Sequence, residues 1–447
     1  MMTFSLSSMA EVTGGRVIGG DVEIRGMSHD ARRIEPGNLF CALPGARHDG
    51  HAFLGQARDN GAEAALVARE IDDALPQLLV GDVGEAMGLL ARAWRDRLDV
   101  TVVGITGSNG KTTVKEMTAA ILSTQGPTLA TRGNYNNELG VPLTLARLDP
   151  SHRFAVIEMG CNRPGDIAYL AGIARPDVGV VTNAGPAHLE RLGSVEGVAR
   201  TKGEMFSALP EAGTAVINAD DDFAPLWRKL AGDRRIISFG EDGAANVSGV
   251  LSGALALVHT PGGDFEFAPA LPGRHNFCNA LAAAAAAVAL DVPVKAIAEA
   301  LAAVKSLPGR LQIRRHADGW QLVDDTYNAN PASLYAALQL LSEMGGRDHW
   351  LVLGDMAELG PGGERLHAEM GQTARDLGVS RLFTVGDLAR ASADAFDGDA
   401  RHFEDREALV AALENELAAG VTCLVKGSRS MGMERIVDRL LGEECTC

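Results

Sequence analysis

The chain has 447 residues, of which 46% are hydrophobic and 22% are charged, and its formal net charge at pH 7 is −17. This length allows about three domains of roughly 150 residues, each large enough to bury its own core. The composition is typical of a soluble globular protein. The negative charge argues against nonspecific binding to nucleic acid or to an anionic membrane.

The cysteines and the apolar runs both favour a cytoplasmic protein. The six cysteines are scattered and include no Cys-x-x-Cys pair, as expected for a chain that is kept reduced. Residues 1–10 lack the cationic start and the long apolar core of a signal peptide. The longest apolar run, residues 280–290, is shorter than the ~20 residues that cross a bilayer. We therefore expect no membrane span.

Residues 1–97 form the first predicted domain, because short apolar strands alternate there with turns and helices. The pattern indicates a small α/β domain that ends with a helix. We predict strands at residues 16–18, 22–24, 39–43, 64–67 and 78–80, and helices at residues 51–60 and 84–98.

Residues 98–307 form the second predicted domain, where strands alternate with helices at longer spacing. Such spacing is expected for a mostly parallel, doubly wound sheet. Residues 240–272, rich in glycine and small side chains, predict antiparallel hairpins. We predict strands at residues 100–105, 154–158, 178–182 and 214–218, and helices at residues 114–122, 277–290 and 294–303.

A breaker cluster at residues 306–310 predicts a linker to a third domain, residues 308–447. Strands again alternate with helices, so we expect a third α/β unit. Its predicted strands are residues 320–324, 350–354, 381–385 and 421–425, and polar clusters follow three of them at residues 324–331, 354–360 and 426–429.

The strand at residues 100–105 leads into a glycine-rich turn that predicts a nucleoside-triphosphate site. A strand, a glycine turn and a helix N-terminus together present backbone N–H groups and a positive dipole end to a phosphate. Lys111 would reach the terminal phosphates, and the Thr112 hydroxyl would hold a magnesium ion. Ile105 stands where the usual first glycine is expected, and a tight strand-to-helix connection is the structural alternative. The predicted loop comprises Gly107, Ser108, Asn109, Gly110, Lys111, Thr112 and Thr113.

Other polar residues follow predicted strands, where open α/β sheets build their sites. Glu158 ends an apolar strand, so its carboxylate can complete a magnesium shell with the Thr112 hydroxyl and water. His188 and Lys202 are weaker candidates by themselves, because a lone histidine is more often structural and a lysine on a helix is usually solvated. The asparagine-rich residues 131–140 suit either turn capping or recognition of a polar ligand.

Taken in order, these segments resemble the Mur ligase family, the ATP-dependent amide ligases of peptidoglycan precursor synthesis. The resemblance covers essentially the whole chain. It implies an α/β architecture with three domains: a small N-terminal domain that binds a UDP-sugar, a central P-loop domain with a parallel sheet, and a Rossmann-like C-terminal domain that closes on ATP. The motifs that carry it are residues 30–32, 37–40, 49–51, 107–113, 133–144, 158–160, 325–331 and 354–360.

The resemblance also implies roles for individual residues. In the family, a lysine at the position of Lys202 is carbamylated, which requires a lysine whose pKa is lowered by its surroundings. The implied catalytic residues are Lys111, Lys202, His188 and Glu158, and the implied metal ligands are Thr112, Glu158, His188 and Lys202. The implied ATP contacts beyond the loop are Asn276, Asn279, Arg310 and Asp325. The implied contacts to the other substrates are Asp30, Arg32, Asn134, Asn137, Asn328 and Asn330.

Within the family, the motifs look like those of the member that joins D-alanyl-D-alanine to UDP-N-acetylmuramoyl-tripeptide. This resemblance implies ATP and two Mg²⁺ ions, an acyl-phosphate intermediate and a cytoplasmic monomer. The relative that adds a free diamino acid usually carries an Asp-Asn-Pro-Arg motif, which this chain lacks. Folylpolyglutamate synthetase does not suit the N-terminal domain, and a P-loop kinase would need neither Lys202 nor the third domain. A nonenzymatic nucleotide-gated protein is the remaining alternative, and it would release no phosphate.

Overall fold

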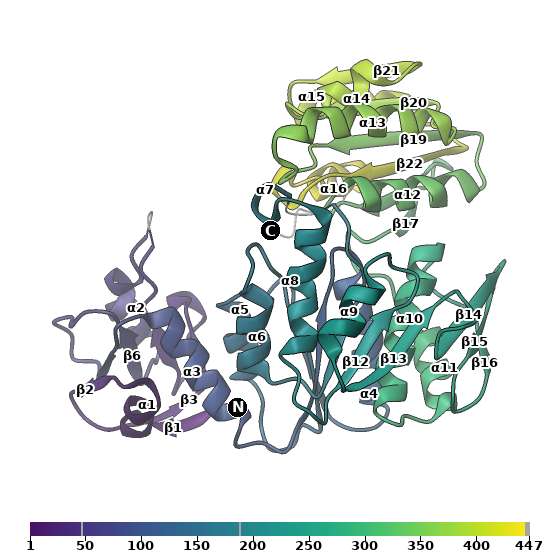
Figure 1. Ribbon diagram of the computed structural model, residues 1–447. Helices are drawn as coiled ribbons and strands as arrows, with labels where there is room; N and C mark the ends of the chain where they lie inside the picture. Colours follow the sequence, from purple (N-terminus) through teal and green to yellow (C-terminus); the bar gives the residue numbers. More distant parts are fainter. Residues whose placement is uncertain (46–47, 187–188, 443–447) are drawn as a thin grey trace.

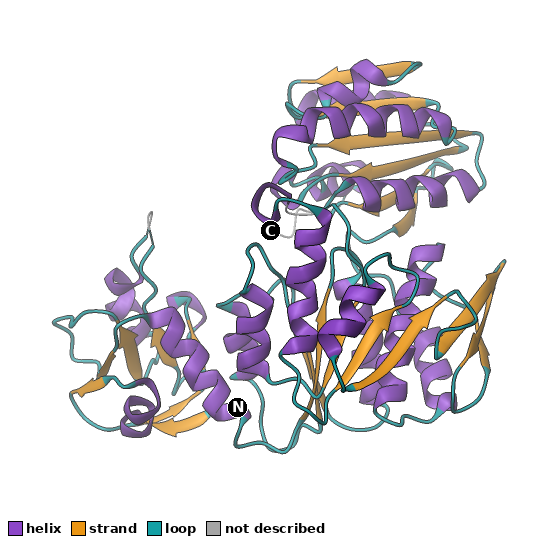
Figure 2. Cartoon of the chain, viewed as in Figure 1, coloured by secondary structure: helices purple, strands orange, loops and turns teal. Residues whose placement is uncertain are grey.

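The structure is a computed structural model that describes residues 1–45, 48–186 and 189–442. The chain forms an N-terminal domain at one side, a large central domain and a C-terminal domain above the central one (Figure 1). Strands and helices occur together in all three domains (Figure 2). The fold is therefore α/β with three domains, as the sequence predicts.

The N-terminal domain is built on a five-stranded sheet and a two-stranded pair. Its elements are β1 (Thr3–Ser5), α1 (Leu6–Thr13), β2 (Arg16–Ile18), β3 (Glu23–Arg25), β4 (Met27–Ser28), η1 (Ala31–Arg33), β5 (Leu39–Cys41), η2 (Gly50–Phe53), α2 (Leu54–Asp59), β6 (Ala64–Val67), β7 (Gln77–Leu79) and α3 (Val83–Arg95). The sheet has the order β2-β7-β6-β5-β4, and β1 pairs with β3. Because side chains alternate along a strand, Phe40 packs in the core beside α2 and Leu39 in the core beside α1 and α3.

The central domain contains a nine-stranded sheet. Its elements are β8 (Thr101–Thr106), α4 (Lys111–Ser123), β9 (Thr128–Ala130), α5 (Gly140–Leu145), β10 (Phe154–Glu158), α6 (Asp166–Ala174), β11 (Val178–Val181), α7 (Leu189–Leu192), α8 (Val195–Ser207), β12 (Thr214–Asn218), α9 (Ala224–Ala231), β13 (Arg235–Gly240), β14 (Val247–Ser252), β15 (Leu255–His259), β16 (Phe265–Phe267), α10 (Arg274–Ala289) and α11 (Val294–Ala303). The strand order is β16-β15-β14-β13-β12-β11-β8-β10-β9, parallel from β14 to β9. The antiparallel pairs β14–β15 and β15–β16 confirm the predicted hairpins.

Helices cover both faces of the central sheet. Val103 and Ile105 of β8 pack in one core with α4, α10 and α11, whereas Val102 packs in the opposite core with α6 and α8. The alanines of α10 are buried, which lets this helix lie close to α4. β8 lies between β10 and β11. After β8 the chain adds β9 and β10 towards one edge of the sheet, and it then passes β8 to add β11 and β12 towards the other edge. The direction of the connections therefore reverses beside β8. Open α/β sheets bind ligands at such a switch point.

The C-terminal domain contains a six-stranded sheet between two helical layers. Its elements are β17 (Gln312–Arg315), β18 (Gln321–Asp325), α12 (Pro331–Glu343), β19 (Asp348–Gly354), η3 (Gly360–Gly362), α13 (Gly363–Asp376), β20 (Arg381–Val385), α14 (Arg390–Ala395), β21 (Asp399–Phe403), α15 (Arg406–Glu416), β22 (Val421–Lys426), η4 (Arg429–Met431) and α16 (Glu434–Leu441). The strand order is β17-β18-β22-β19-β20-β21, with only β17 antiparallel. The buried His367 secures the chain after β19, because its Nε2 accepts from the Met356 N–H at 2.9 Å.

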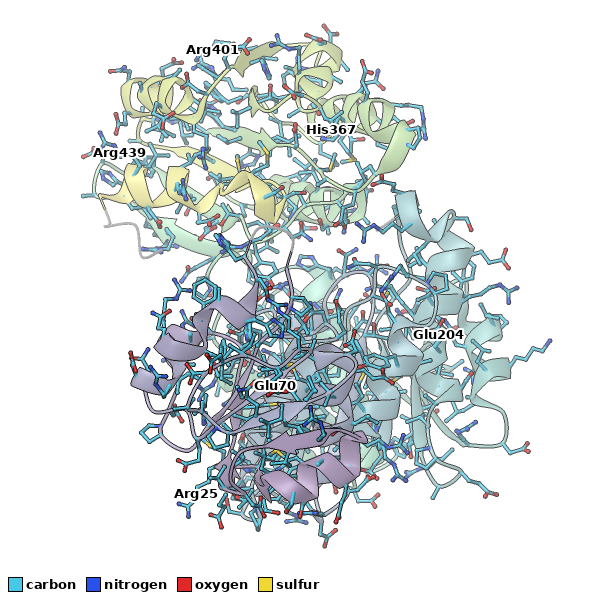
Figure 3. The ribbon with its side chains drawn as sticks, turned by 90° about the vertical axis from the view of Figure 1, so that its left-hand side faces the viewer. Arg25, Glu70, Glu204, His367, Arg401 and Arg439 are labelled. Atoms are coloured by element: carbon cyan, nitrogen blue, oxygen red, sulfur yellow. The ribbon has the colours of Figure 1, made fainter. Side chains whose placement is uncertain are left out.

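The domains pack on one another through specific elements. α3 contacts α5 and α6, and the Trp94 Nε1 donates to the Leu148 carbonyl at 3.0 Å. In the view from the N-terminal side, Arg25 and Glu70 lie in the nearest domain, and the C-terminal domain, marked by His367, lies above it (Figure 3). Glu204, on α8 in the same view, accepts from the N–H groups of Gly165 and Ala168 and so caps α6.

The predicted helices and strands are confirmed within a few residues, but six strands were missed. β1, β4 and β9 have only two or three residues each, too few for a recognisable alternation. β17 and β21 are polar edge strands, whose solvent-facing side chains resemble those of loops. β13 is apolar and could have been recognised. In the part of the chain that the structure describes, no helix has the length and hydropathy needed to cross a membrane.

Candidate active site

A cavity of about 1020 Å³ opens where the three domains meet. Its walls come from the start of α3, the polar ends of β8, β10 and β11, the start of α10 and the C-terminal domain. The predicted residues that line it are Ser108, Asn109, Gly110, Lys111, Thr112, Thr113, Asn137, Glu158, Lys202, Asn276, Asn279, Arg310, Asp325, Asn328 and Asn330. The tertiary structure thus brings segments almost 320 residues apart in the chain into one site, from Ser108 to Lys426.

The loop between β8 and α4 has the geometry of a phosphate cradle. Gly110, immediately before α4, has a φ of +81°, and a Cβ there would lie 2.2 Å from the Asn279 Oδ1. A Cβ on Gly107 would lie 1.8 Å from the Thr182 Oγ1. Both positions therefore require glycine, for conformation and for space. The loop ends at the N-terminus of a 13-residue helix, whose free N–H groups favour an anion.

The end of β11 holds this loop in place. The Asn183 Oδ1 accepts from the Asn109 N–H at 2.9 Å, and the Thr182 Oγ1 donates to the Asn109 carbonyl at 2.6 Å. The Ser108 hydroxyl accepts from the Gly185 N–H at 2.9 Å. The loop is thus fixed from the neighbouring strand without its helix-terminal amides being used.

Lys111 folds back on its own loop. Its Nζ donates to the carbonyl of Gly107 at 2.7 Å and to that of Ser108 at 3.3 Å. Burial, and next the charge of Lys202, lower the pKa of Lys111 to about 8. Below that pH the cavity holds a cation that forms no ion pair with any carboxylate of the described residues, and such a cation suits an anionic ligand.

Thr112 and Glu158 form an oxygen-rich pair beside the loop. The Thr112 hydroxyl donates to the Glu158 Oε2 at 2.8 Å and accepts from the Arg310 guanidinium at 2.8 Å. The other carboxylate oxygen, Oε1, accepts from the Asn136 amide at 2.7 Å. Glu158 is only 2% exposed. A carboxylate and a hydroxyl that leave the remaining positions to phosphate and water suit Mg²⁺.

Lys202 also lines the cavity and is more deeply buried than Lys111. Its side chain is 1% exposed, and its Nζ lies 3.6 Å from the Cys161 Sγ. Burial lowers the pKa of Lys202, which the neighbouring Cys161 partly opposes. The lysine is therefore not the solvated charge that its helical position suggests by itself. In the described residues, no cluster of three or more His, Cys, Asp or Glu side chains forms a preassembled metal site.

The C-terminal domain contributes a second polar wall. Lys426 at the end of β22 is 2% exposed, and its Nζ forms an ion pair with Asp325 and donates to the Asn328 carbonyl at 3.0 Å. The Asn330 amide crosses the cavity and donates to the Asn109 Oδ1 at 2.8 Å. Arg310 stacks on the Tyr327 ring, with its Cζ 4.1 Å from the centroid. The C-terminal domain therefore touches the phosphate loop directly.

The two asparagines of α10 are held by local bonds. The Asn276 amide donates to the Pro272 carbonyl at 2.8 Å, and its oxygen accepts from the Asn279 amide at 3.3 Å. Both side chains are buried and line the cavity on the far side of the loop from Lys202. Burial lowers the pKa of the neighbouring His275 to about 4, so this end of the cavity has a neutral imidazole at pH 7.

Some predicted site residues lie outside this cavity. Asp30 caps η1 and forms an ion pair with Arg32 at 2.9 Å, and hydrogen bonds from Arg32 are the main cause that lowers the pKa of Asp30 to about 2. Asn134 is exposed in the loop between β9 and α5, and Gly107 contributes its carbonyl to Lys111. His188 lies outside the described residues.

Three family profiles match the chain in the order of its domains. They are the Mur ligase family catalytic domain over residues 23–95, the Mur ligase middle domain over residues 105–287 and the Mur ligase glutamate ligase domain over residues 309–429. The UDP-N-acetylmuramoyl-tripeptide–D-alanyl-D-alanine ligase of Escherichia coli (strain K12) is 44% identical over 455 residues, covering 100% of both chains.

This chain belongs to the Mur ligase family.

Two solved structures of Mur ligases share its whole architecture. A crystal structure of MurF from Acinetobacter baumannii is 34% identical with a TM-score of 0.91, and 99% of each chain is covered. MurF ligase from Thermotoga maritima in complex with ADP is 29% identical with a TM-score of 0.83, covering 94% of this chain and 97% of the other. The similarity thus extends across all three domains and not only to the P-loop unit.

Sequence reasoning missed several residues of this Mur ligase site. Asn136, which holds Glu158, lies within the asparagine-rich segment but was not singled out. Asn183, which fixes the phosphate loop, directly follows a predicted strand end, and that position was the available signal. Lys426 ends a strand in a polar cluster, whereas nothing in the sequence marks Cys161 as a neighbour of Lys202.

Proposed function

We propose that this Mur ligase joins D-alanyl-D-alanine to UDP-N-acetylmuramoyl-tripeptide at the expense of ATP, through an acyl phosphate, and yields the UDP-pentapeptide, ADP and phosphate. The observation that carries the proposal is the 44% identity to a ligase named for these substrates, over the full length of both chains. The cavity supports it, because it joins a phosphate loop to walls from two further domains.

The phosphate loop and Lys111 would hold ATP for attack by the tripeptide's terminal carboxylate. Below pH 8 the Lys111 ammonium stabilises the charge on the transferring phosphoryl group, so that catalysis is mainly positioning and electrostatics. The amine of D-alanyl-D-alanine then attacks the acyl phosphate, and phosphate leaves. Arg310 and Asn330 reach the loop from the linker and the C-terminal domain, and their contacts help to exclude the water that would hydrolyse the acyl phosphate.

The residues beside the loop fit magnesium. Thr112 and Glu158 supply hard oxygen ligands, and we propose that His188 and a carbamylated Lys202 complete the binding of two ions. When bound, magnesium neutralises phosphate charge and orients the phosphates for transfer. Lys202 suits carbamylation because burial lowers its pKa, which favours the neutral amine that reacts with carbon dioxide.

The two ends of the cavity would take different substrates. We propose that Asn276, Asn279 and Asp325 contact ATP and that Asn137, Asn328 and Asn330 contact the peptide substrates, since all six side chains line the cavity. We propose that Asp30, Arg32 and Asn134 bind the UDP-sugar away from the reacting carboxylate, where remote binding energy aligns the tripeptide. A cytoplasmic, monomeric enzyme stays our expectation.

The test is phosphate release by the purified chain. Release should require ATP, UDP-N-acetylmuramoyl-tripeptide and D-alanyl-D-alanine together, and mass spectrometry should find the UDP-pentapeptide. Omission of each component in turn is the control. Release with a UDP-dipeptide and a free diamino acid instead would favour the relative that adds the third residue. No release under any combination would contradict an enzymatic role.

A second experiment tests Lys202. Lys202→Ala should lose most activity, and short carboxylic acids such as formate or acetate should restore part of it by replacing the carbamate. Circular dichroism checks that the variant is folded. A folded variant that no carboxylic acid rescues would count against the carbamate.

A further inference from the structure

Cys161 and Lys202 form a contact that the proposed reaction does not use. Cys161 lies three residues after β10, Lys202 lies within α8, and the Lys202 Nζ lies 3.6 Å from the Cys161 Sγ. The side chains are 5% and 1% exposed, respectively. Among the described residues, this thiol is the one group with which the Lys202 side-chain amine forms a hydrogen bond or ion pair. A buried amine is thus aimed at a buried sulfur.

The cavity gives small molecules access to this pair. Both Cys161 and Lys202 line it, whereas Cys41 and Cys423 are fully buried elsewhere. Cys278 also lines the cavity, but its Sγ donates to the Glu241 Oε1 at 3.1 Å. Of the four cysteines in the described residues, Cys161 alone combines access from the cavity with an amine neighbour.

We propose that Cys161 and Lys202 are an oxidation-sensitive pair, which peroxide converts into a sulfur–nitrogen cross-link. Hydrogen peroxide first oxidises the thiol to a sulfenic acid by two electrons, and the peroxide is reduced to water. The Lys202 nitrogen, as the free amine that carries no carbamate, then attacks sulfur, the S–O bond breaks, and the hydroxide leaves as water with a proton from nitrogen. The flexible four-carbon stem of lysine lets Nζ close the remaining distance.

The cross-link is reversible and removes Lys202 from the site. Two equivalents of a thiol reductant restore the free thiol and the free amine and are themselves oxidised to a disulfide. While the S–N bond exists, Lys202 can take no part in binding a substrate or a metal. The loss of ligase activity rests on the proposed function, but formation of the cross-link does not.

Peptide mapping of the full-length protein tests the proposal. After treatment with a small excess of hydrogen peroxide, digestion should yield the Cys161 and Lys202 peptides joined, with a mass two hydrogens below their sum. Phosphate release should fall in proportion to the cross-linked fraction, and dithiothreitol should reverse both changes. Oxidation of Cys161 to a sulfenic or sulfinic acid without the joined peptides would overturn the proposal.

Two variants provide matched controls. Cys161→Ser should form no cross-link, and its phosphate release, normalised to its own untreated value, should resist peroxide. Cys278→Ser, which removes the other cavity thiol, should cross-link as the unmodified protein does. If Cys161→Ser does not fold, the peptide map of the unmodified protein still decides. A protein that forms the cross-link with peroxide but releases no phosphate before treatment would contradict the proposed function and leave this inference standing.

Discussion

The central and C-terminal domains each bring a buried lysine to the cavity, and they treat its charge differently. Lys426 of the C-terminal domain is 2% exposed and forms an ion pair with Asp325. Lys202 of the central domain is 1% exposed and has a thiol as its neighbour. The Lys111 ammonium, within the part of the chain that the structure describes, donates to two carbonyls. The lysine of the C-terminal wall is therefore paired with a carboxylate, whereas the two lysines of the central wall form no ion pair with any described residue.

This difference separates a supporting role from a chemical one. A buried charge without a partner costs stability, so a buried lysine that lacks a carboxylate partner marks a candidate site of binding or chemistry. The central wall has this property and also carries the phosphate loop, Thr112 and Glu158. The wall from the C-terminal domain, in which Lys426 is paired with Asp325, instead positions Arg310 and Asn330 against the loop. Substitutions should accordingly impair chemistry on one side and stability or ATP affinity on the other.

The largest effect should come from removing the cation of the phosphate loop. Lys111→Ala should lower kcat on the order of 10³-fold, because a preorganised charge at the transferring phosphoryl group is lost. Phosphate release at saturating substrates measures this change. Lys229→Ala, at an exposed position on α9, is the control and should behave as the unmodified enzyme. Near-normal activity of Lys111→Ala would refute the assignment of the loop.

Breaking the ion pair of the opposite wall should affect stability. Asp325→Asn leaves the buried Lys426 charge without its partner, so the free energy of unfolding should fall by about 3 kcal/mol. Urea unfolding followed by tryptophan fluorescence measures the change. Glu404→Gln removes an exposed pair with Arg390 in the same domain and should cost less than about 1 kcal/mol. Equal losses in the two variants would show that burial of the pair is unimportant.

Arg310 should matter for ATP affinity more than for the chemical step. Arg310→Ala removes the bond to Thr112 and the stacking on Tyr327, so KM for ATP should rise about tenfold with a smaller change in kcat. Initial rates at varied ATP separate the two constants. Arg315→Ala, at an exposed position on β17, should leave both unchanged. A loss confined to kcat would place Arg310 in the chemistry instead.

The smallest effect should be a pH dependence. Lys111 is protonated below its pKa of about 8, so the cation that we propose to hold phosphate disappears as the pH rises through that value. kcat/KM for ATP should fall about twofold between pH 7 and pH 8 and more steeply above. The dependence of kcat/KM for ATP on pH measures this fall. In Lys111→Arg the fall should move to higher pH, because a guanidinium keeps its proton. A flat profile to pH 10 would exclude Lys111 as the titrating group.

The local elements could be predicted because their signals are local. The apolar run of β8, the glycine turn and the start of α4 are contiguous, and the steric limits at Gly107 and Gly110 agree with the predicted cradle. The polar edge strands β17 and β21 could not be recognised, because their pairing partners and not their own side chains define them as strands. The same holds for Asn136 and Asn183, whose roles depend on the groups that they contact.

By itself, the sequence determined the α/β class, the phosphate loop and the resemblance to Mur ligases, since periodicity and contiguous motifs survive without tertiary contacts. Only the tertiary structure decided which cations are paired and which are not. Lys202 and Lys426 both look like ordinary lysines in the chain, and burial against Cys161 in one case and Asp325 in the other separates them. Partners from distant segments set this difference, because the environment of a buried charge depends on everything packed around it.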